Sequence, residues 1–215
     1  MHSRTYDKVF AKNLPDDVGN DYLIANASEQ TKQLNRYKNS ILAVDAKFKL
    51  FIDKLKENGL YQNSIIILLS DHGQEFYEYG FYGHNSAYDF EQVGAPLIIR
   101  MPNKTPKTIN YMTSHLDIVP TLMHQLGVEN PTSDYSHGQN LFDPNYKREC
   151  SYVGNWNENA IVCEKETIII SDLVTKSFSN EVRNTRTSKI EENYDKKNMN
   201  KVILNALMEN RRFIK

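Results

Sequence analysis

One short stretch constrains the fold of this chain more than any other: an aliphatic run that ends in an acidic residue, a histidine and a glycine. The run is Ile65–Leu69, and Ser70, Asp71, His72 and Gly73 follow it directly. A run of β-branched and aliphatic residues bounded by turn-forming residues predicts a buried parallel strand. Open α/β sheets bind ligands at the carboxyl ends of such strands. The sequence therefore places a candidate site at Asp71 and His72.

The residue types at this strand end favour a metal ion. A carboxylate beside an imidazole suits a divalent metal, with Zn²⁺ or Mn²⁺ favoured over Mg²⁺ or Ca²⁺. Gly73 lets the backbone turn away without a side chain that crowds the ion. An Asp that caps a helix and a His that packs would give the same pattern, so both interpretations stay open. The loop Glu75–Tyr88 favours the metal, because it places His84 within reach of Asp71 and His72.

Helix and strand patterns alternate through the first two thirds of the chain. Residues 28–58 predict a long amphipathic helix that ends before Gly59 and packs its apolar stripe on a sheet. Residues 97–101 predict a second buried strand, and a helix capped by Asp117 is expected to run through Leu126. The apolar stripe consists of Leu34, Tyr37, Ile41, Val44, Phe48, Phe51, Ile52 and Leu55. This alternation predicts a doubly wound α/β fold.

The composition changes near residues 143–144. Short β-like runs at 151–154, 160–163 and 167–171 predict a small antiparallel meander, followed by a polar stretch and a helix over 198–210. Val202, Leu204 and Leu207 are the residues of that helix expected to be buried. We divide the chain into an irregular segment (1–27), an α/β part (28–143) and a meander-plus-helix subdomain (144–215).

Charge and hydropathy exclude several classes of function. The chain has 215 residues, with 26 Lys and Arg against 27 Asp and Glu, so no overall charge attracts nucleic acid. No apolar run approaches the roughly 18 residues of a membrane span, and the first ten residues lack the apolar core of an export signal. Nucleic acid is therefore not an expected partner, and we expect neither an anchor nor a leader within these residues.

Three linked motifs resemble one known family. The segment SDHGQEFYEYGFYGHNSAYDFEQVGAPLIIRMP (70–102) and the later HLDIVPTLMHQLGV (115–128) are similar to the sulfatases and head-group transferases of the alkaline phosphatase superfamily. DYSHGQNLF (134–142) and the terminal NRRFI (210–214) resemble the YejM (also PbgA) type of inner-membrane sulfatase-like proteins. The resemblance covers about residues 30–215. It implies part of a doubly wound sulfatase-like sheet with a small carboxyl-terminal antiparallel subdomain.

The resemblance assigns roles residue by residue. It implies that Asp71 and His72 bind the metal, and that His84 binds the anionic oxygens of a phosphate or sulfate ester. An imidazole there favours a phosphoryl group, and a lipid head group is among the candidate substrates. The implied location of the complete protein is the inner membrane with a periplasmic domain, so an upstream transmembrane region is an expected partner.

The resemblance also leaves two functions open. The family's nucleophile and other acidic ligand lie on strands of the amino-terminal half, which we do not find in these residues. We therefore expect a carboxyl-terminal part of a metal-dependent hydrolase or transferase that is inactive by itself. The alternative is a non-catalytic envelope regulator or lipid-binding protein that uses the fold as a scaffold.

Other polar residues have weaker assignments. His115 and Asp117 could reach the site, but packing and capping are the commoner roles. Glu75 and Glu78 could carry protons, although loop carboxylates are usually solvated. A hairpin centred on residues 155–158 sets Cys150 opposite Cys163. We expect two free thiols as the commoner arrangement, with a disulfide as the alternative.

Overall fold

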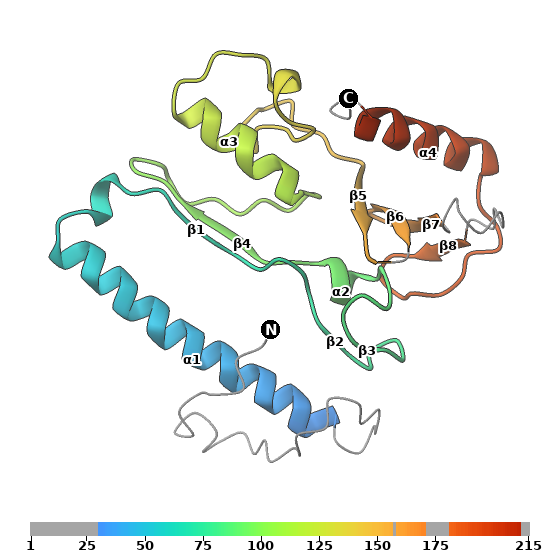
Figure 1. The fold of residues 1–215 in the computed structure, drawn as a ribbon, viewed down its shortest axis with the longest axis horizontal. Helices are drawn as coiled ribbons and strands as arrows, with labels where there is room; N and C mark the ends of the chain where they lie inside the picture. The colour runs from blue at the N-terminus through green and yellow to red at the C-terminus, as the bar shows by residue number, and fades with distance from the viewer. Residues whose placement is uncertain (1–29, 157, 171–180, 212–215) are drawn as a thin grey trace. The chain divides into compact units, whose positions relative to one another are not determined.

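The computed structural model describes residues 30–156, 158–170 and 181–211 (Figure 1). The chain forms two compact units, which we describe separately. Within the described residues, unit 1 comprises residues 30–87 and 91–106, and unit 2 comprises residues 88–90 and 107–211 with the gaps given above. The predicted irregular segment 1–27 lies outside the described residues. The domain boundary at residue 143 stays a prediction.

Unit 1 begins with a long helix and continues with short strands. In chain order its elements are α1 (Gln30–Glu57), η3 (Tyr61–Asn63), β1 (Ile66–Leu69), β2 (Glu75–Phe76), β3 (Tyr82–Gly83), α2 (Phe90–Val93, of which Phe90 belongs to unit 2) and β4 (Leu97–Arg100). The long helix is confirmed within two residues at each end. It stops before Gly59, whose φ of +70° is the left-handed conformation that ends many helices.

The face that α1 buries differs from the predicted apolar stripe. Its buried residues are Gln33, Asn39, Ser40 and Ala43. Ile41, Val44 and Phe51 of the stripe are 48%, 56% and 51% exposed. The stripe was therefore wrong as a description of the buried face, because periodicity identifies one apolar face but not what covers it. The start of α1 contacts β2 instead: the rings of Tyr37 and Phe76 lie 5.1 Å apart between centroids.

The strand pair in unit 1 corrects the prediction of parallel, buried strands. β1 and β4 pair antiparallel, with Ile66 opposite Arg100 and Leu69 opposite Leu97. Leu69 is 43% exposed and Ile98 61% exposed. An aliphatic run indicates a strand but not its direction, which depends on the connection. Residues 70–96 contain a hairpin with strands of two residues each and a four-residue helix. They contain no long crossover helix, which a parallel pair of strands would need.

Unit 2 contains a four-stranded sheet with a helix packed on it. Its elements are η4 (His115–Asp117), α3 (Ile118–Gln125), η5 (Thr132–Asp134), β5 (Cys150–Gly154), β6 (Asn159–Cys163), β7 (Glu166–Ile170), β8 (Glu181–Asn184) and α4 (Lys196–Arg211). The sheet has the order β5-β6-β7-β8, and every pair is antiparallel. The predicted meander is therefore confirmed. Strand β8 was missed, because its sequence EVRN has a single apolar residue, Val182.

The core of unit 2 lies between its sheet and α4. Ile161, Ile168 and Val182 are at most 2% exposed, and Met199, Val202, Ile203 and Ala206 of α4 pack against them. Burial of Val202 is confirmed in part, since it is partly buried. Leu204 is 57% exposed, so its predicted burial was wrong. The side chain of Leu207 lies outside the described residues.

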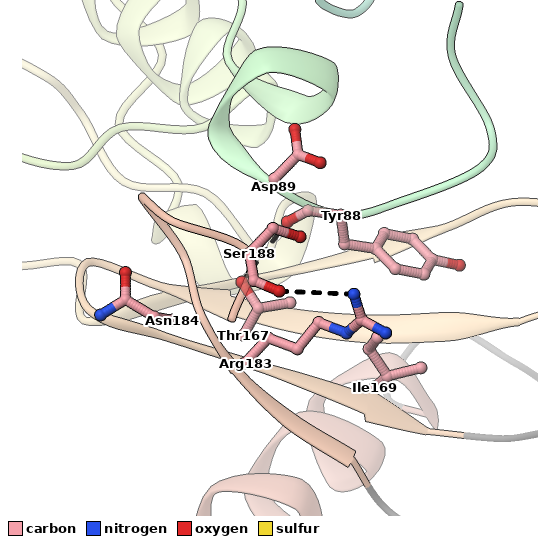
Figure 2. A pocket seen from close by; sticks show the side chains of 7 residues that line it. All are labelled: Tyr88, Asp89, Thr167, Ile169, Arg183, Asn184 and Ser188. Carbon is pink, nitrogen blue, oxygen red and sulfur yellow. Dashed lines mark hydrogen bonds between the residues drawn. The ribbon is translucent and has the colours of Figure 1, made fainter. Parts of the chain in front are cut away.

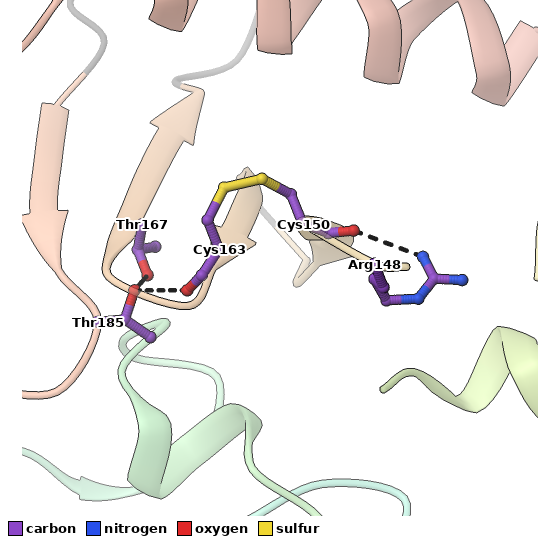
Figure 3. Close-up of a disulfide and its surroundings, with 5 residues drawn as sticks. All are labelled: Arg148, Cys150, Cys163, Thr167 and Thr185. Atoms are coloured by element: carbon purple, nitrogen blue, oxygen red, sulfur yellow. Dashed lines mark hydrogen bonds between the residues drawn. A yellow bond between two sulfur atoms is a disulfide. The ribbon is translucent and has the colours of Figure 1, made fainter. Parts of the chain in front are cut away.

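The two cysteines form a disulfide, the less expected of the two alternatives. Cys150 on β5 lies directly opposite Cys163 on β6, as the hairpin predicted, and their sulfur atoms are bonded (Figure 3). The expectation of two free thiols is therefore wrong for this structure. The Thr185 hydroxyl donates to the Cys163 carbonyl over 2.9 Å and contacts the Thr167 hydroxyl at 3.0 Å. These bonds connect the end of β6 and the start of β7 to Thr185, the residue that follows β8.

Candidate active site

The turn after β1 is held by a glycine with no room for a side chain. The Gly73 N–H donates to the Gln92 carbonyl over 2.9 Å. A Cβ at Gly73 would lie 2.1 Å from the Glu91 carbonyl oxygen and 2.7 Å from that of Gly94. From the sequence, Gly73 was expected to leave space for an ion. The structure gives a different reason, which is the close approach of this turn to residues 91–94.

Asp71 and His72 lie side by side at this turn. The His72 Nδ1 atom is 2.7 Å from the Gly73 carbonyl oxygen, which only accepts, so Nδ1 is the donor of this hydrogen bond. The Nε2 atom is 3.7 Å from Asp71 Oδ2. The Asp71 side chain is 84% exposed and that of His72 is 33% exposed.

The electrostatics of the turn favour an ionised Asp71. Burial raises the pKa of this carboxyl, but His72 and the N–H groups of Asp71 and His72 lower it more, so that it lies below its ordinary value. The carboxylate also accepts the His72 N–H over 3.1 Å. Asp71 is therefore the charged, solvent-accessible oxygen donor that a cation requires.

His84 lies against His72. The two imidazole rings stack with their centroids 4.0 Å apart and an angle of 26° between their planes. The His84 Nδ1 atom is 3.4 Å from the Gln74 side-chain oxygen. β2 and β3 position the segment, with Glu75 opposite Gly83 and Phe76 opposite Tyr82. The structure thus brings together the three residues singled out in the sequence.

Glu75 has a role that the sequence argument missed. We expected a solvated loop carboxylate, but Glu75 is fully buried. Its Oε1 atom accepts the N–H groups of Tyr79 and Phe81, and its Oε2 atom accepts from the Gln92 amide over 2.8 Å. Gln92, which is 3% exposed, was not identified from the sequence at all. Glu78 is exposed and accepts the Phe76 N–H.

His115 and Asp117 belong to unit 2. Asp117 is fully buried. It forms a capping box with Ser114, which is the N-cap residue of the short helix η4. The predicted side-chain cap of α3 was wrong: Asp117 stands at the N-cap position of α3 but makes no capping hydrogen bond there, and its carboxylate instead completes the capping box of η4. Asp117 also forms an ion pair with Arg148 at 2.6 Å and accepts the Tyr146 hydroxyl over 2.7 Å. Burial and this hydrogen bond raise the pKa of Tyr146, so its hydroxyl stays a donor. His115 is exposed.

A small pocket in unit 2 is a poor candidate for a substrate site. It lies beside β7 and β8 and is lined by residues that include Tyr88, Thr167, Arg183 and Ser188 (Figure 2). It has no room for even one water molecule. Ligand sites usually measure roughly 300 Å³ or more. Arg183 points into this space but donates to the Ser188 carbonyl over 3.4 Å, so part of its hydrogen-bonding capacity is already used.

The donor atoms at the turn after β1 match part of the coordination geometry of a metal ion. Two ligands of one tetrahedral zinc ion lie roughly 3.3 Å apart. The 3.7 Å between His72 Nε2 and Asp71 Oδ2 is close to this value. The Nδ1 bond to a carbonyl is also the usual support of a metal-binding histidine. Among the described residues, however, no three His, Cys, Asp or Glu side chains form a metal-binding group. Asp71 and His72 therefore fit part of a metal site.

Comparisons with known proteins show which proteins this chain resembles. Residues 2–128 match the sulfatase family, so the match begins earlier than residue 30, where the resemblance was placed. Lipoteichoic acid synthase-like YvgJ of Bacillus subtilis is 37% identical over 138 residues, which cover 56% of this chain and 21% of that protein. Inner membrane protein YejM of Salmonella typhimurium is 26% identical over 190 residues, which cover 87% of this chain and 30% of that protein.

Solved structures agree at the level of the fold. Phosphonate monoester hydrolase SpPMH from Silicibacter pomeroyi superimposes with a TM-score of 0.65 at 19% identity, over 85% of this chain and 41% of that one. The chain thus spans less than half the length of each protein compared here. In the part of the chain that the structure describes, no helix is both long and apolar enough to span a bilayer. The family match over residues 2–128 shows that the chain belongs to the sulfatase family, and within that family it is similar to inner membrane protein YejM.

Proposed function

We propose that this chain contributes Asp71, His72 and His84 to the site of a metal-dependent hydrolase or head-group transferase that acts on phosphate or sulfate esters. The observation that carries the proposal is the juxtaposition of these three side chains. The His72 Nε2 atom lies 3.7 Å from the Asp71 carboxylate, and the His84 ring stacks on the His72 ring. The family match supports the hydrolase or transferase class.

The chemistry follows from what each side chain offers. A divalent ion, with Zn²⁺ or Mn²⁺ favoured, would lower the pKa of a hydroxyl nucleophile and neutralise charge on the ester. Asp71 would bind the ion through its exposed carboxylate, and His72 through Nε2. His84 would bind a peripheral oxygen of the ester or protonate the leaving group. A phosphoryl group, including that of a lipid head group, is the favoured substrate. The proposal includes a location for the complete protein: an upstream transmembrane region would anchor it in the inner membrane, with this part in the periplasm.

The first prediction concerns metal binding by the chain. We expect Zn²⁺ or Mn²⁺ to bind weakly, because two protein ligands leave most of the coordination shell to water. Asp71→Ala and His72→Ala should each weaken binding by at least about tenfold. Calorimetric titration measures this, with the exposed Asp45→Ala and His124→Ala as matched controls that should bind like the wild type. Identical isotherms for all five proteins would contradict the site.

The second prediction concerns turnover. We expect no measurable phosphomonoesterase, phosphodiesterase or sulfatase activity from residues 1–215 by themselves, because the proposed residues supply neither a nucleophile nor a full set of metal ligands. The assay adds Zn²⁺, Mn²⁺, Mg²⁺ or Ca²⁺ and uses nitrophenyl phosphate, bis-nitrophenyl phosphate and nitrophenyl sulfate. Metal-dependent turnover that disappears in His72→Ala would show that the nucleophile lies within this chain.

The alternative is a non-catalytic envelope protein that uses the fold as a scaffold. Inner membrane protein YejM, whose name gives a location and no activity, aligns over 87% of the chain and is compatible with this alternative. Fold alone does not decide between these functions. The titration above separates them, since a scaffold has no need of a cation at Asp71 and His72.

A further inference from the structure

We propose that Glu75 and Gln92 are positioning residues that hold His84 against His72, and thereby set the geometry of the proposed site. The inference rests on the proposed function, because it assigns a purpose to the placement of these two histidines. Neither Glu75 nor Gln92 is placed to contact a substrate, since they are 0% and 3% exposed. Their effect would pass through the backbone that carries the histidines.

Gln92 connects the two halves of the site. Its backbone carbonyl accepts the Gly73 N–H, which belongs to the turn that carries Asp71 and His72. Its side-chain oxygen accepts the N–H groups of Ser86 and Ala87, each over 3.1 Å, just after His84. Gln92 therefore contacts both the turn that carries Asp71 and His72 and the loop that carries His84.

Glu75 holds the same loop from its other side. The Oε1 atom accepts the N–H groups of Tyr79 and Phe81 over 2.9 and 3.0 Å, which fixes the backbone before His84. The Oε2 atom accepts from the Gln92 amide over 2.8 Å. The Glu75 carboxylate, which binds the backbone before His84, is thus hydrogen-bonded to the Gln92 amide, which binds the backbone after His84.

The loop needs such a link because its own backbone pairing is short. β2 and β3 pair over two residues each. Gly80, Gly83 and Asn85 all have positive φ, so the path of the loop depends on conformations that few sequences favour. Buried hydrogen bonds to a charged group are among the stronger ones and are directional. They therefore specify one path of the loop, which an apolar contact would not.

The orientation of the donors provides a sharp test. In Glu75→Gln, two amides face each other and one N–H group must point at another donor. In Gln92→Glu, two buried carboxylates face each other. The exchange Glu75→Gln with Gln92→Glu restores the link in reverse, since Gln at position 75 accepts from Tyr79 and Phe81 and donates to Glu at position 92. Such a reciprocal rescue is the signature of a direct coupling.

The experiment measures the histidine geometry without a metal. We expect the nuclear Overhauser effect between the His72 and His84 ring protons in the wild type, its loss in each single variant, and its return in the double variant. Zn²⁺ affinity should fall by about tenfold or more in the single variants and recover in the exchange. Gln62→Glu, at an exposed position, controls for the added charge. Gln92→Met keeps the backbone bond to Gly73 and replaces Gln92→Glu if that variant does not fold.

Two outcomes would overturn the inference. A persistent ring-to-ring signal in folded single variants would show that Glu75 and Gln92 do not position His84. Loss of the signal in the double variant as well would show that the two residues are not coupled as proposed. A wild type that shows the ring-to-ring signal but binds no metal would contradict the proposed function and leave the positioning result standing, so the two failures are distinguishable.

Discussion

Asp117→Ala is expected to lower the free energy of unfolding of unit 2 by about 3–5 kcal/mol, because it leaves a buried arginine without its partner. The side chains of Asp117 and Arg148 are 0% and 8% exposed, and the Arg148 Nη2 atom donates to Asp117 Oδ1 over 2.6 Å. The carboxylate also accepts from the Ser114 N–H, the Gln139 N–H and the Tyr146 hydroxyl. Truncation would therefore leave several buried donors unsatisfied at once.

Urea unfolding of the 215-residue chain, followed by circular dichroism, measures this loss. Asp134→Ala is the matched control, since Asp134 is exposed, and it should change stability by less than about 0.5 kcal/mol. Adding Arg148→Met to Asp117→Ala should recover part of the loss, because it removes the uncompensated charge. A loss below about 1 kcal/mol in Asp117→Ala would show that this network does not stabilise the unit.

Local signals in the sequence predicted the elements well. The long helix α1, the strands β1 and β4, the helix before Gly127 and the first three strands of the meander all lie where their patterns indicate. Each has a signal that acts over a few residues: an apolar period, a run of β-branched residues or a glycine with positive φ at the end of a helix. Strand β8 shows the limit, because Glu181–Asn184 is held in the sheet by its pairing with β7 rather than by its own composition.

Direction and burial were harder to predict, since both depend on residues far away in the chain. The aliphatic run of β1 is compatible with either pairing direction, and its antiparallel pairing with β4 follows from the connection through residues 70–96. The polar face that α1 buries also has no periodic signal. Gln33, Asn39 and Ser40 are buried there, whereas Ile41 and Val44 are exposed.

In the candidate site, too, some residues could be recognised from the sequence and others could not. Asp71 and His72 are recognisable because their residue types suit a metal, and His84 because the family resemblance implies that it binds an anion; the structure brings the three together. Glu75 and Gln92 resemble ordinary polar loop residues in the sequence. Their burial becomes visible once the loop has closed around them, because the N–H groups that they satisfy come from positions 79, 81, 86 and 87.

Removal of the disulfide is expected to lower the free energy of unfolding of unit 2 by about 3 kcal/mol. Cys150 and Cys163 are separated by 13 residues, and a bridge that closes a loop of roughly 15 residues restricts the unfolded chain by about that amount. Both residues also pack against the core formed by Ile161, Ile168 and Val182. Arg148 donates to the Cys150 carbonyl over 3.4 Å (Figure 3), and the same guanidinium forms the ion pair with Asp117.

Two measurements test the bridge independently. Alkylation of the unfolded protein without reductant, followed by mass spectrometry, should add no label, whereas two labels would mean two free thiols. Urea unfolding should then show the loss of about 3 kcal/mol both on reduction of the wild type and in the variant Cys150→Ala with Cys163→Ala. Reductant should leave that double variant unchanged, which controls for effects unrelated to the thiols. A reduced wild type as stable as the oxidised one would show that pairing along β5 and β6, and not the covalent bond, holds this hairpin closed.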